Sequence, residues 1–233
     1  MMNPSKEKLI QRYKKSERVN HWIVAGCFVL LAISGLGFFF PSFFWMTHIF
    51  GTPQLARILH PFVGVVMFVG FFIQFFRYWK YNFIDQEDVK WLKSVKKVIA
   101  GEEVGDVGKY NAGQKGMFWM MSLCVLVLML TGFVAWRPYF AHLFPIPVIR
   151  VALLLHALFG VVLICSIMVH IYAAIWVKGT IRAMVEGVVS QTWAHKHHPR
   201  WYREVMQKHS EQRSDEANDV KPLPDVVQQK EEL

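Results

Sequence analysis

Four long stretches without charged residues constrain the fold of this chain more than any other feature. No Lys, Arg, Asp or Glu occurs within residues 19–56, 58–76, 116–136 and 151–177. A helix needs about 20 apolar residues to cross the hydrocarbon core of a bilayer, so each of the last three stretches fits one span. The first is too long for a single span, and Pro41 with the Gly51-Thr52-Pro53 turn divides it.

The sequence therefore predicts an all-α integral membrane four-helix bundle within residues 1–205. The expected spans cover residues 20–40, 54–77, 115–136 and 149–177. The first apolar run ends in bulky aromatic residues and lacks a small-residue cleavage pattern, so we interpret it as a retained span rather than a signal peptide. Residues 206–233 are rich in Glu, Lys, Asp and Gln, which predicts a disordered cytoplasmic tail.

The basic residues predict the orientation of the bundle. They concentrate in residues 1–20, 77–115 and 178–233. The opposite side has only three: Arg57, Arg137 and Arg150. Because cytoplasmic loops carry the excess of Lys and Arg, both termini should be cytoplasmic in a multi-pass protein of the bacterial inner membrane. The net charge of +9 fits contact with anionic lipid. It does not indicate nucleic-acid binding, because the charges flank apolar spans.

Four histidines lie inside the predicted spans. An ionisable group in a span is costly and suggests function, although a neutral His bonded to a neighbouring helix explains any one of them equally well. His21 opens the first span near the cytoplasm, and His60 lies early in the inward-running second span. In the fourth span, His156 lies near the outer end and His170 near the inner end. Depth thus pairs His60 with His156, and His21 with His170.

The spacing in the fourth span adds a second constraint. His156 and His170 are separated by about 21 Å along a helix and by roughly 40° of rotation, so one face presents two imidazoles at different depths. Small residues lie four positions from these histidines, for example Ala152 and Gly160, and they leave room for a flat ring. The pattern favours two haem groups, each held by two His between the helices. A His/Met site stays open because the chain has 11 Met.

Other metal chemistries fit less well. Zinc favours three or four converging ligands, and the paired His lie far apart. No Cys-x-x-Cys-His occurs, which excludes covalent c-type haem, and we expect Cys27, Cys124 and Cys165 to be core residues. The run His195-Lys196-His197-His198 is interpreted as a basic solvated tail rather than a metal site.

Several segments resemble the cytochrome b556 (gamma) subunits of respiratory membrane-bound formate dehydrogenases. They are GTPQLARILHPF at 51–62, DVGKYNAGQK at 106–115, WRPYF at 136–140, HIYAAIWVKG at 170–179 and KHHPRWYRE at 196–204. The similarity covers about residues 18–205. Hydrogenase cytochrome b subunits share the four-helix haem scaffold, whereas the KYNAGQK and KHHPRWYRE strings are more specific to the formate dehydrogenase type.

The resemblance implies two haem b groups with the same ligand pairs. It also implies a quinone site at Asn111, Gly113 and Gln114, with His170 nearby, where menaquinone or ubiquinone is reduced at the cytoplasmic side. Electrons would arrive from an iron–sulfur beta subunit and, through it, from the catalytic alpha subunit that oxidises formate. The heterotrimer would assemble into trimers. This chain would be the electron-transfer and quinone-reducing subunit, without formate-oxidising activity of its own.

The residues themselves leave two roles open. Asn111 and Gln114 have the spacing of a helix-start capping box as well as of a quinone site. Arg57 and Arg137 are candidate partners for the carboxylates of an outer haem, or anchors of the helices at the interface.

Two rival functions remain. One is the cytochrome b of a hydrogenase or of another periplasmic dehydrogenase, which differs only in its docking partner. The other is a haem-free membrane anchor or transporter whose His residues form a proton path. The sequence shows no internal repeat of the kind common in transporters.

Overall fold

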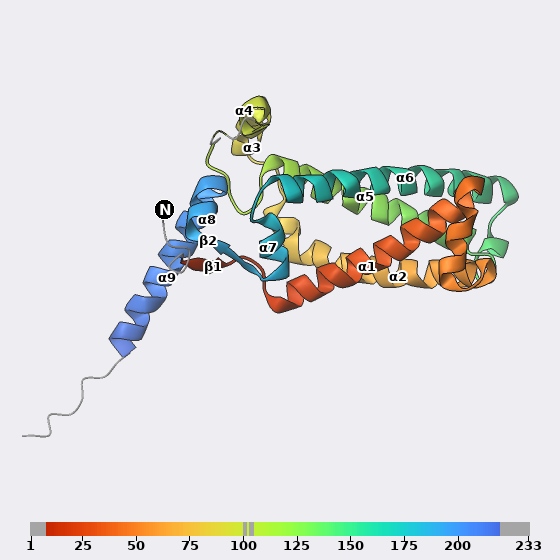
Figure 1. Ribbon diagram of the computed structural model, residues 1–233, viewed down its shortest axis with the longest axis horizontal. Helices are drawn as coiled ribbons and strands as arrows, with labels where there is room; N and C mark the ends of the chain where they lie inside the picture. Colours follow the sequence, from red (N-terminus) through yellow and green to blue (C-terminus); the bar gives the residue numbers. More distant parts are fainter. Residues whose placement is uncertain (1–7, 100–101, 103–104, 220–233) are drawn as a thin grey trace, which may run out of the picture.

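The computed structural model describes residues 8–99, 102 and 105–219, and it arranges four long helices side by side in an elongated bundle (Figure 1). They are α1 (Lys15–Phe39), α2 (Pro53–Tyr78), α5 (Ala112–Ala135) and α6 (Ile146–Trp176). All four are long and apolar enough to cross a membrane, which confirms the predicted four-helix membrane fold. The first helix begins five residues before the predicted span, because the polar residues of the interface continue it.

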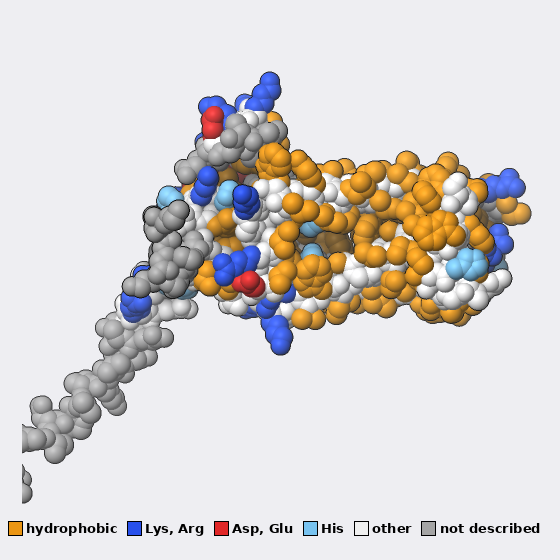
Figure 2. Space-filling model, viewed as in Figure 1, with side chains coloured by type: hydrophobic (Ala, Val, Ile, Leu, Met, Phe, Trp, Pro, Cys, Tyr) orange, Lys and Arg blue, Asp and Glu red, His pale blue; other side chains and the backbone are white. Residues whose placement is uncertain are grey.

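The bundle is apolar outside as well as inside. Orange side chains cover most of its length in Figure 2, as expected where lipid is the solvent. At mid-depth a small buried core joins the helices, formed by Met67, Cys124, Val125 and Leu163. Cys124 matches the expected core role, whereas Cys165 is exposed, so the prediction of a core role is wrong for Cys165.

Short segments close the outer end of the bundle. The 3-10 helix η2 (Pro41–Phe50) separates α1 from α2, and η4 (Ala141–Leu143) lies between α5 and α6. Gly51 adopts φ 93°, and the Thr52 side chain then accepts a hydrogen bond from the Leu55 amide at 3.1 Å, which caps α2. The predicted division of the first apolar stretch is confirmed.

The remaining elements gather at the opposite end (Figure 1). They are β1 (Leu9–Gln11), η3 (Trp79–Tyr81), α3 (Gln86–Lys93), α4 (Val95–Ile99), α7 (Thr180–Val185), β2 (Val188–Ser190), α8 (Gln191–His197) and α9 (Pro199–Asp219). All belong to the three segments rich in basic residues, so this is the end that the charge rule assigns to the cytoplasm.

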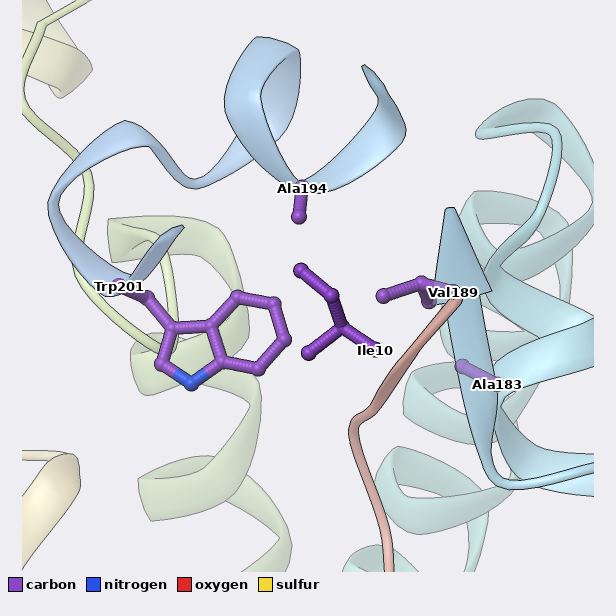
Figure 3. Close-up of a cluster of buried hydrophobic side chains, with 5 residues drawn as sticks. All are labelled: Ile10, Ala183, Val189, Ala194 and Trp201. Atoms are coloured by element: carbon purple, nitrogen blue, oxygen red, sulfur yellow. The ribbon is translucent and has the colours of Figure 1, made fainter. Parts of the chain in front are cut away.

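A two-stranded sheet joins the beginning of the described chain to the segment after the last span. Strand β1 pairs antiparallel with β2, with Ile10 opposite Val189. These two side chains pack with Ala183, Ala194 and Trp201 in a buried cluster (Figure 3). The sheet was not predicted, because three-residue strands carry no pattern that periodicity can detect.

Helix α9 corrects the prediction for the tail. It continues to Asp219, so residues 206–219 are helical rather than disordered. Glu, Gln, Lys and Arg are good helix formers, and Gln207 donates to Glu211 one turn later at 2.9 Å. Residues 220–233 lie outside the described residues, and the domain boundary at 205 stays a prediction.

Candidate functional site

The outer histidine pair lies between all four long helices. His60 of α2 and His156 of α6 have ring centroids 6.2 Å apart. The Nδ1 atom of His60 lies 2.7 Å from the Ser34 hydroxyl of α1. The Nδ1 atom of His156 lies 2.9 Å from the Thr131 hydroxyl of α5. Because both Nδ1 atoms are engaged, the Nε2 atoms are the ones available to bind a metal.

This separation fits one metal ion bound by both rings. Two imidazoles that bind from opposite sides at about 2 Å have centroids roughly 6 Å apart. Within the described ranges, no three His, Cys, Asp or Glu side chains form a group that could hold a metal ion. A haem needs only two axial ligands from the protein, so the pair of histidines is the donor set it requires.

There is also space for a flat ring beside the pair. A Cβ atom added at Gly160, one turn from His156, would meet no atom within 4 Å. Ala56 and Ala152, one turn before His60 and His156, are small but already covered by protein atoms, so the open space lies on the Gly160 side. The predicted clearance is therefore present beside His156.

The inner pair lies toward the cytoplasmic end. His21 lies near the start of α1 and His170 near the end of α6. Among the described residues, five buried side-chain atoms lack a hydrogen-bond partner, on Arg12, Arg18, His21, Gln74 and Arg77. All five residues lie at the cytoplasmic end. Unsatisfied buried donors are costly, and a cofactor with carboxylate groups would satisfy the arginine and glutamine donors among them.

The predicted quinone residues begin helix α5. Asn111 Oδ1 accepts from the Gln114 amide at 2.9 Å, and Gln114 Oε1 accepts from the Asn111 amide at 3.0 Å. This reciprocal pair confirms the capping-box interpretation. A Cβ atom at Gly113 would meet the Trp91 ring at 3.2 Å, so α3 packs closely here. The two side-chain NH₂ groups take no part in the capping bonds.

An ion-pair network, which we call the α3 clamp, holds α3 against α5 and α9. It consists of Asp85, Asp88, Lys115 and Arg200. The Lys115 Nζ atom lies 2.5 Å from Asp88 and 3.5 Å from Asp85, and Arg200 donates to Asp85 at 2.8 Å. Burial raises the pKa of Asp85, but the bonds from Arg200 and the Asp88 amide and the charge of Lys115 together lower it to about 2.

His198 corrects the prediction of a solvated basic run. Only 2% of its surface is exposed. Its Nδ1–H donates to the Gly108 carbonyl at 2.8 Å, and its Nε2 accepts from Arg12 at 3.3 Å. Arg12 also donates to the Lys109 carbonyl at 2.6 Å and lies over the Trp201 ring. Arg12 and His198 thus bind the backbone of Lys109 and Gly108, just before Asn111. No local sequence pattern indicated these contacts.

These contacts make the cytoplasmic end sensitive to acid. Burial, followed by the Arg12 charge, lowers the pKa of His198 to about 2, whereas an unfolded His titrates near pH 6.5. Between these values the unfolded chain binds a proton that the folded protein does not, so stability falls as pH drops below about 6.5. The loss should be roughly 2 kcal/mol by pH 5.

Hydrogen exchange of the β1 and β2 amides, corrected for intrinsic rates, measures this effect. Protection should fall between pH 7 and pH 5 in the wild type. It should stay constant in His198→Gln, whose amide can donate to Gly108 and accept from Arg12 without titrating. An equal fall in both proteins would contradict the assignment.

The two arginines predicted to contact the outer haem lie at the protein surface. Arg57 and Arg137 are both exposed. Their role as partners of haem carboxylates stays a prediction.

The fold and the paired histidines define a class of protein, the four-helix membrane cytochromes b. The family model for prokaryotic cytochrome b561 matches residues 12–187. The formate dehydrogenase cytochrome b556(fdo) subunit of Escherichia coli K12 is 62% identical over 196 residues, which is 84% of this chain and 93% of that protein. The chain therefore belongs to the cytochrome b556 subunits of formate dehydrogenase, within the cytochrome b561 family.

Two further relatives extend the comparison. The nitrate-inducible cytochrome b556(Fdn) subunit of Escherichia coli K12 is 50% identical over 215 residues, covering 91% of this chain and 99% of that protein. The cytochrome b556 subunit of Haemophilus influenzae formate dehydrogenase is 48% identical over 202 residues, covering 86% and 85%. The predicted family is confirmed, and membership implies that the chain carries haem b.

Proposed function

We propose that this chain carries electrons through the membrane from an iron–sulfur subunit to a quinone at the cytoplasmic side. On this proposal His60 and His156 hold an outer haem b, and His21 and His170 hold an inner one. The observation that carries the proposal is the matched histidine pairs at the two ends of one bundle, with α6 contributing to both. Each bound haem would supply an iron that cycles between two oxidation states.

Helix α6 sets the spacing of the two sites. It runs unbroken from Ile146 to Trp176, so it fixes His156 and His170 about 21 Å apart along its axis. Moving one electron inward against an inside-negative membrane potential requires about 2.3 kcal/mol of work per 100 mV for a full crossing. Quinone reduction on the inner side, with protons taken from the cytoplasm, would conserve that energy.

The start of α5 supports a quinone site next to the inner pair. Asn111 and Gln114 satisfy each other through their side-chain oxygens, which leaves their NH₂ groups free to donate to a quinone carbonyl. Gly113 lies between them, where the Trp91 ring of α3 packs against it. His170 is the fourth residue of the proposed site, and the quinone is menaquinone or ubiquinone.

The partners follow from the same proposal. An iron–sulfur beta subunit would dock at the outer end and connect this chain to the catalytic alpha subunit, and the heterotrimers would form a trimer. Arg57 and Arg137 would contact the carboxylates of the outer haem from the same end. Basic residues at the opposite end would contact anionic lipid of the bacterial inner membrane.

The test uses the tagged chain purified with its partners. Formate should reduce b-type haem in the complex, and a quinone analogue should block its reoxidation. Hydrogen gas serves as the matched control donor. Reduction by hydrogen and not by formate would assign the chain to a hydrogenase partner instead. Absence of haem absorbance in the purified complex would overturn the electron-transfer proposal and favour an anchor or transporter.

A further inference from the structure

The outer histidines share a supporting feature that the inner ones lack. Each faces a hydroxyl residue followed by glycine on the preceding long helix. For His60 this is Ser34-Gly35, and a Cβ atom at Gly35 would lie 3.7 Å from the His60 Cε1 atom. In each pair the hydroxyl engages Nδ1 and the glycine lies beside the Cε1 edge of the ring.

The second pair repeats this arrangement in α5. The Thr131 hydroxyl lies 2.9 Å from Nδ1 of His156, and a Cβ atom at Gly132 would lie 3.2 Å from the His156 Cε1 atom. That distance is tighter than ordinary van der Waals contact, so Gly132 permits the ring to approach. Helices α1 and α5 thus each present a hydroxyl residue followed by glycine to one of the two outer histidines.

The hydroxyl protons fix the direction of these hydrogen bonds. Ser34 Oγ lies 2.8 Å from the Leu30 carbonyl, and Thr131 Oγ1 lies 2.6 Å from the Val127 carbonyl. A carbonyl oxygen only accepts hydrogen bonds, so each hydroxyl donates its single proton to the backbone. In its hydrogen bond with the histidine, the hydroxyl oxygen must therefore be the acceptor. Both rings must carry their proton on Nδ1, which leaves the lone pair of Nε2 for a metal.

The hydroxyls are shielded from competing water, since Ser34 is 1% and Thr131 8% exposed. The inner histidines differ from the outer ones in their hydrogen bonds. The Nδ1 atom of His21 is buried without a partner. Across the described part of the chain, His170 forms no side-chain hydrogen bond comparable to those of the outer pair. The two sites therefore differ in how their ligands are polarised.

We infer that Ser34 and Thr131 are positioning residues that lower the midpoint potential of the outer haem relative to the inner one. The inference rests on the proposed function. A hydrogen bond accepted from Nδ1–H raises the basicity of the metal-bound nitrogen, which stabilises ferric over ferrous iron. The lower outer potential makes the inward electron step favourable and offsets part of the work against the membrane potential.

The experiment is a redox titration of the purified complex with Ser34→Ala and Thr131→Val, singly and together. The α-band and the low-spin EPR signals follow each haem separately, and a His170→Ala complex with only the outer haem assigns them. The outer potential should rise and the inner one stay constant. We expect about a tenfold change in the one-electron equilibrium between the sites, which corresponds to 59 mV.

Two further sets of variants isolate the hydroxyl. Ser34→Thr and Thr131→Ser keep it and should restore the wild-type potential. Ser122→Ala removes a hydroxyl that donates to the Phe118 carbonyl at 2.7 Å in the same helix as Thr131 but contacts no histidine, and it should change nothing. Loss of the outer haem from Ser34→Ala but not from Ser34→Thr would also support the inference.

The outcomes separate this inference from the proposed function. A wild-type complex without two haems would defeat the proposed function itself. If both haems are present and the Ser34→Ala, Thr131→Val double variant leaves both potentials and EPR signals unchanged, the electron-transfer proposal stands and the positioning role is wrong. An equal shift of both haems, or a fall in the outer potential, would also overturn it.

Discussion

Replacing His156 with Ala should remove one haem from the purified protein and leave the other bound. His156 faces His60 at 6.2 Å between ring centroids, and loss of one axial ligand removes half of the donor set. His170→Ala should remove the other haem, because the two histidines lie about 21 Å apart on α6. Pyridine haemochrome assay against protein concentration should show haem content fall from two to one per chain in each variant.

The spectra should show that different haems are lost. Reduced-minus-oxidised spectra of the two variants should sum to the wild-type spectrum. His142→Ala is the matched control, since His142 lies in η4 at the outer end and should retain both haems. Retention of both haems in either span variant would remove that histidine from the ligand set. Loss of both haems from a stably inserted variant would show that the sites are not independent.

The second large effect should come from Lys115→Met in the α3 clamp. Lys115 and Asp88 are 4% and 5% exposed and lie 2.5 Å apart. Removing one partner leaves a buried carboxylate without its counter-charge, which costs roughly 3–5 kcal/mol. The start of α5 should then lose its packing against α3. Quinone-dependent reoxidation of haem should fall sharply, while both haems stay bound.

An exposed ion pair provides the control. Lys90 lies 2.6 Å from Glu87, but its side chain is 66% exposed, so Lys90→Met should cost far less stability than Lys115→Met. Thermal unfolding and the rate of reoxidation should be measured for both variants. Adding Asp88→Leu to Lys115→Met should recover part of the lost stability, because it removes the unpaired charge. Equal stability of the Lys90 and Lys115 variants would contradict the clamp.

The sequence was sufficient to predict the bundle and that His60 and His156 lie at the same depth. Uncharged stretches of this length cross a bilayer as helices. The position of each histidine along its helix then gives its depth in the membrane. The 6.2 Å separation of His60 and His156 agrees with that prediction. The supporting hydroxyls were not predicted, because Ser34 and Thr131 are ordinary span residues whose contacts cross between helices and leave no local pattern.

The cytoplasmic end was the least predictable part. His198 lies in a polar string, KHHPR, that resembles solvated tail. Its burial depends on Arg12 and Gly108, which are distant in sequence. Such burial arises from tertiary contacts that neither propensity nor periodicity reports. The sheet at Leu9–Gln11 likewise depends on a partner strand that is distant in sequence.

The sheet of β1 and β2 can form only after the membrane spans between the two strands have been inserted. Strand β1 leaves the ribosome before the four spans described here, but its partner, β2, emerges only after the fourth. The intervening residues must therefore cross the membrane an even number of times before the strands can meet. One span that fails to insert would leave β2 on the far side, so the pair can close only when an even number of spans has been inserted. Because the contact joins residues so distant in sequence, its formation should be among the last and slowest steps of folding.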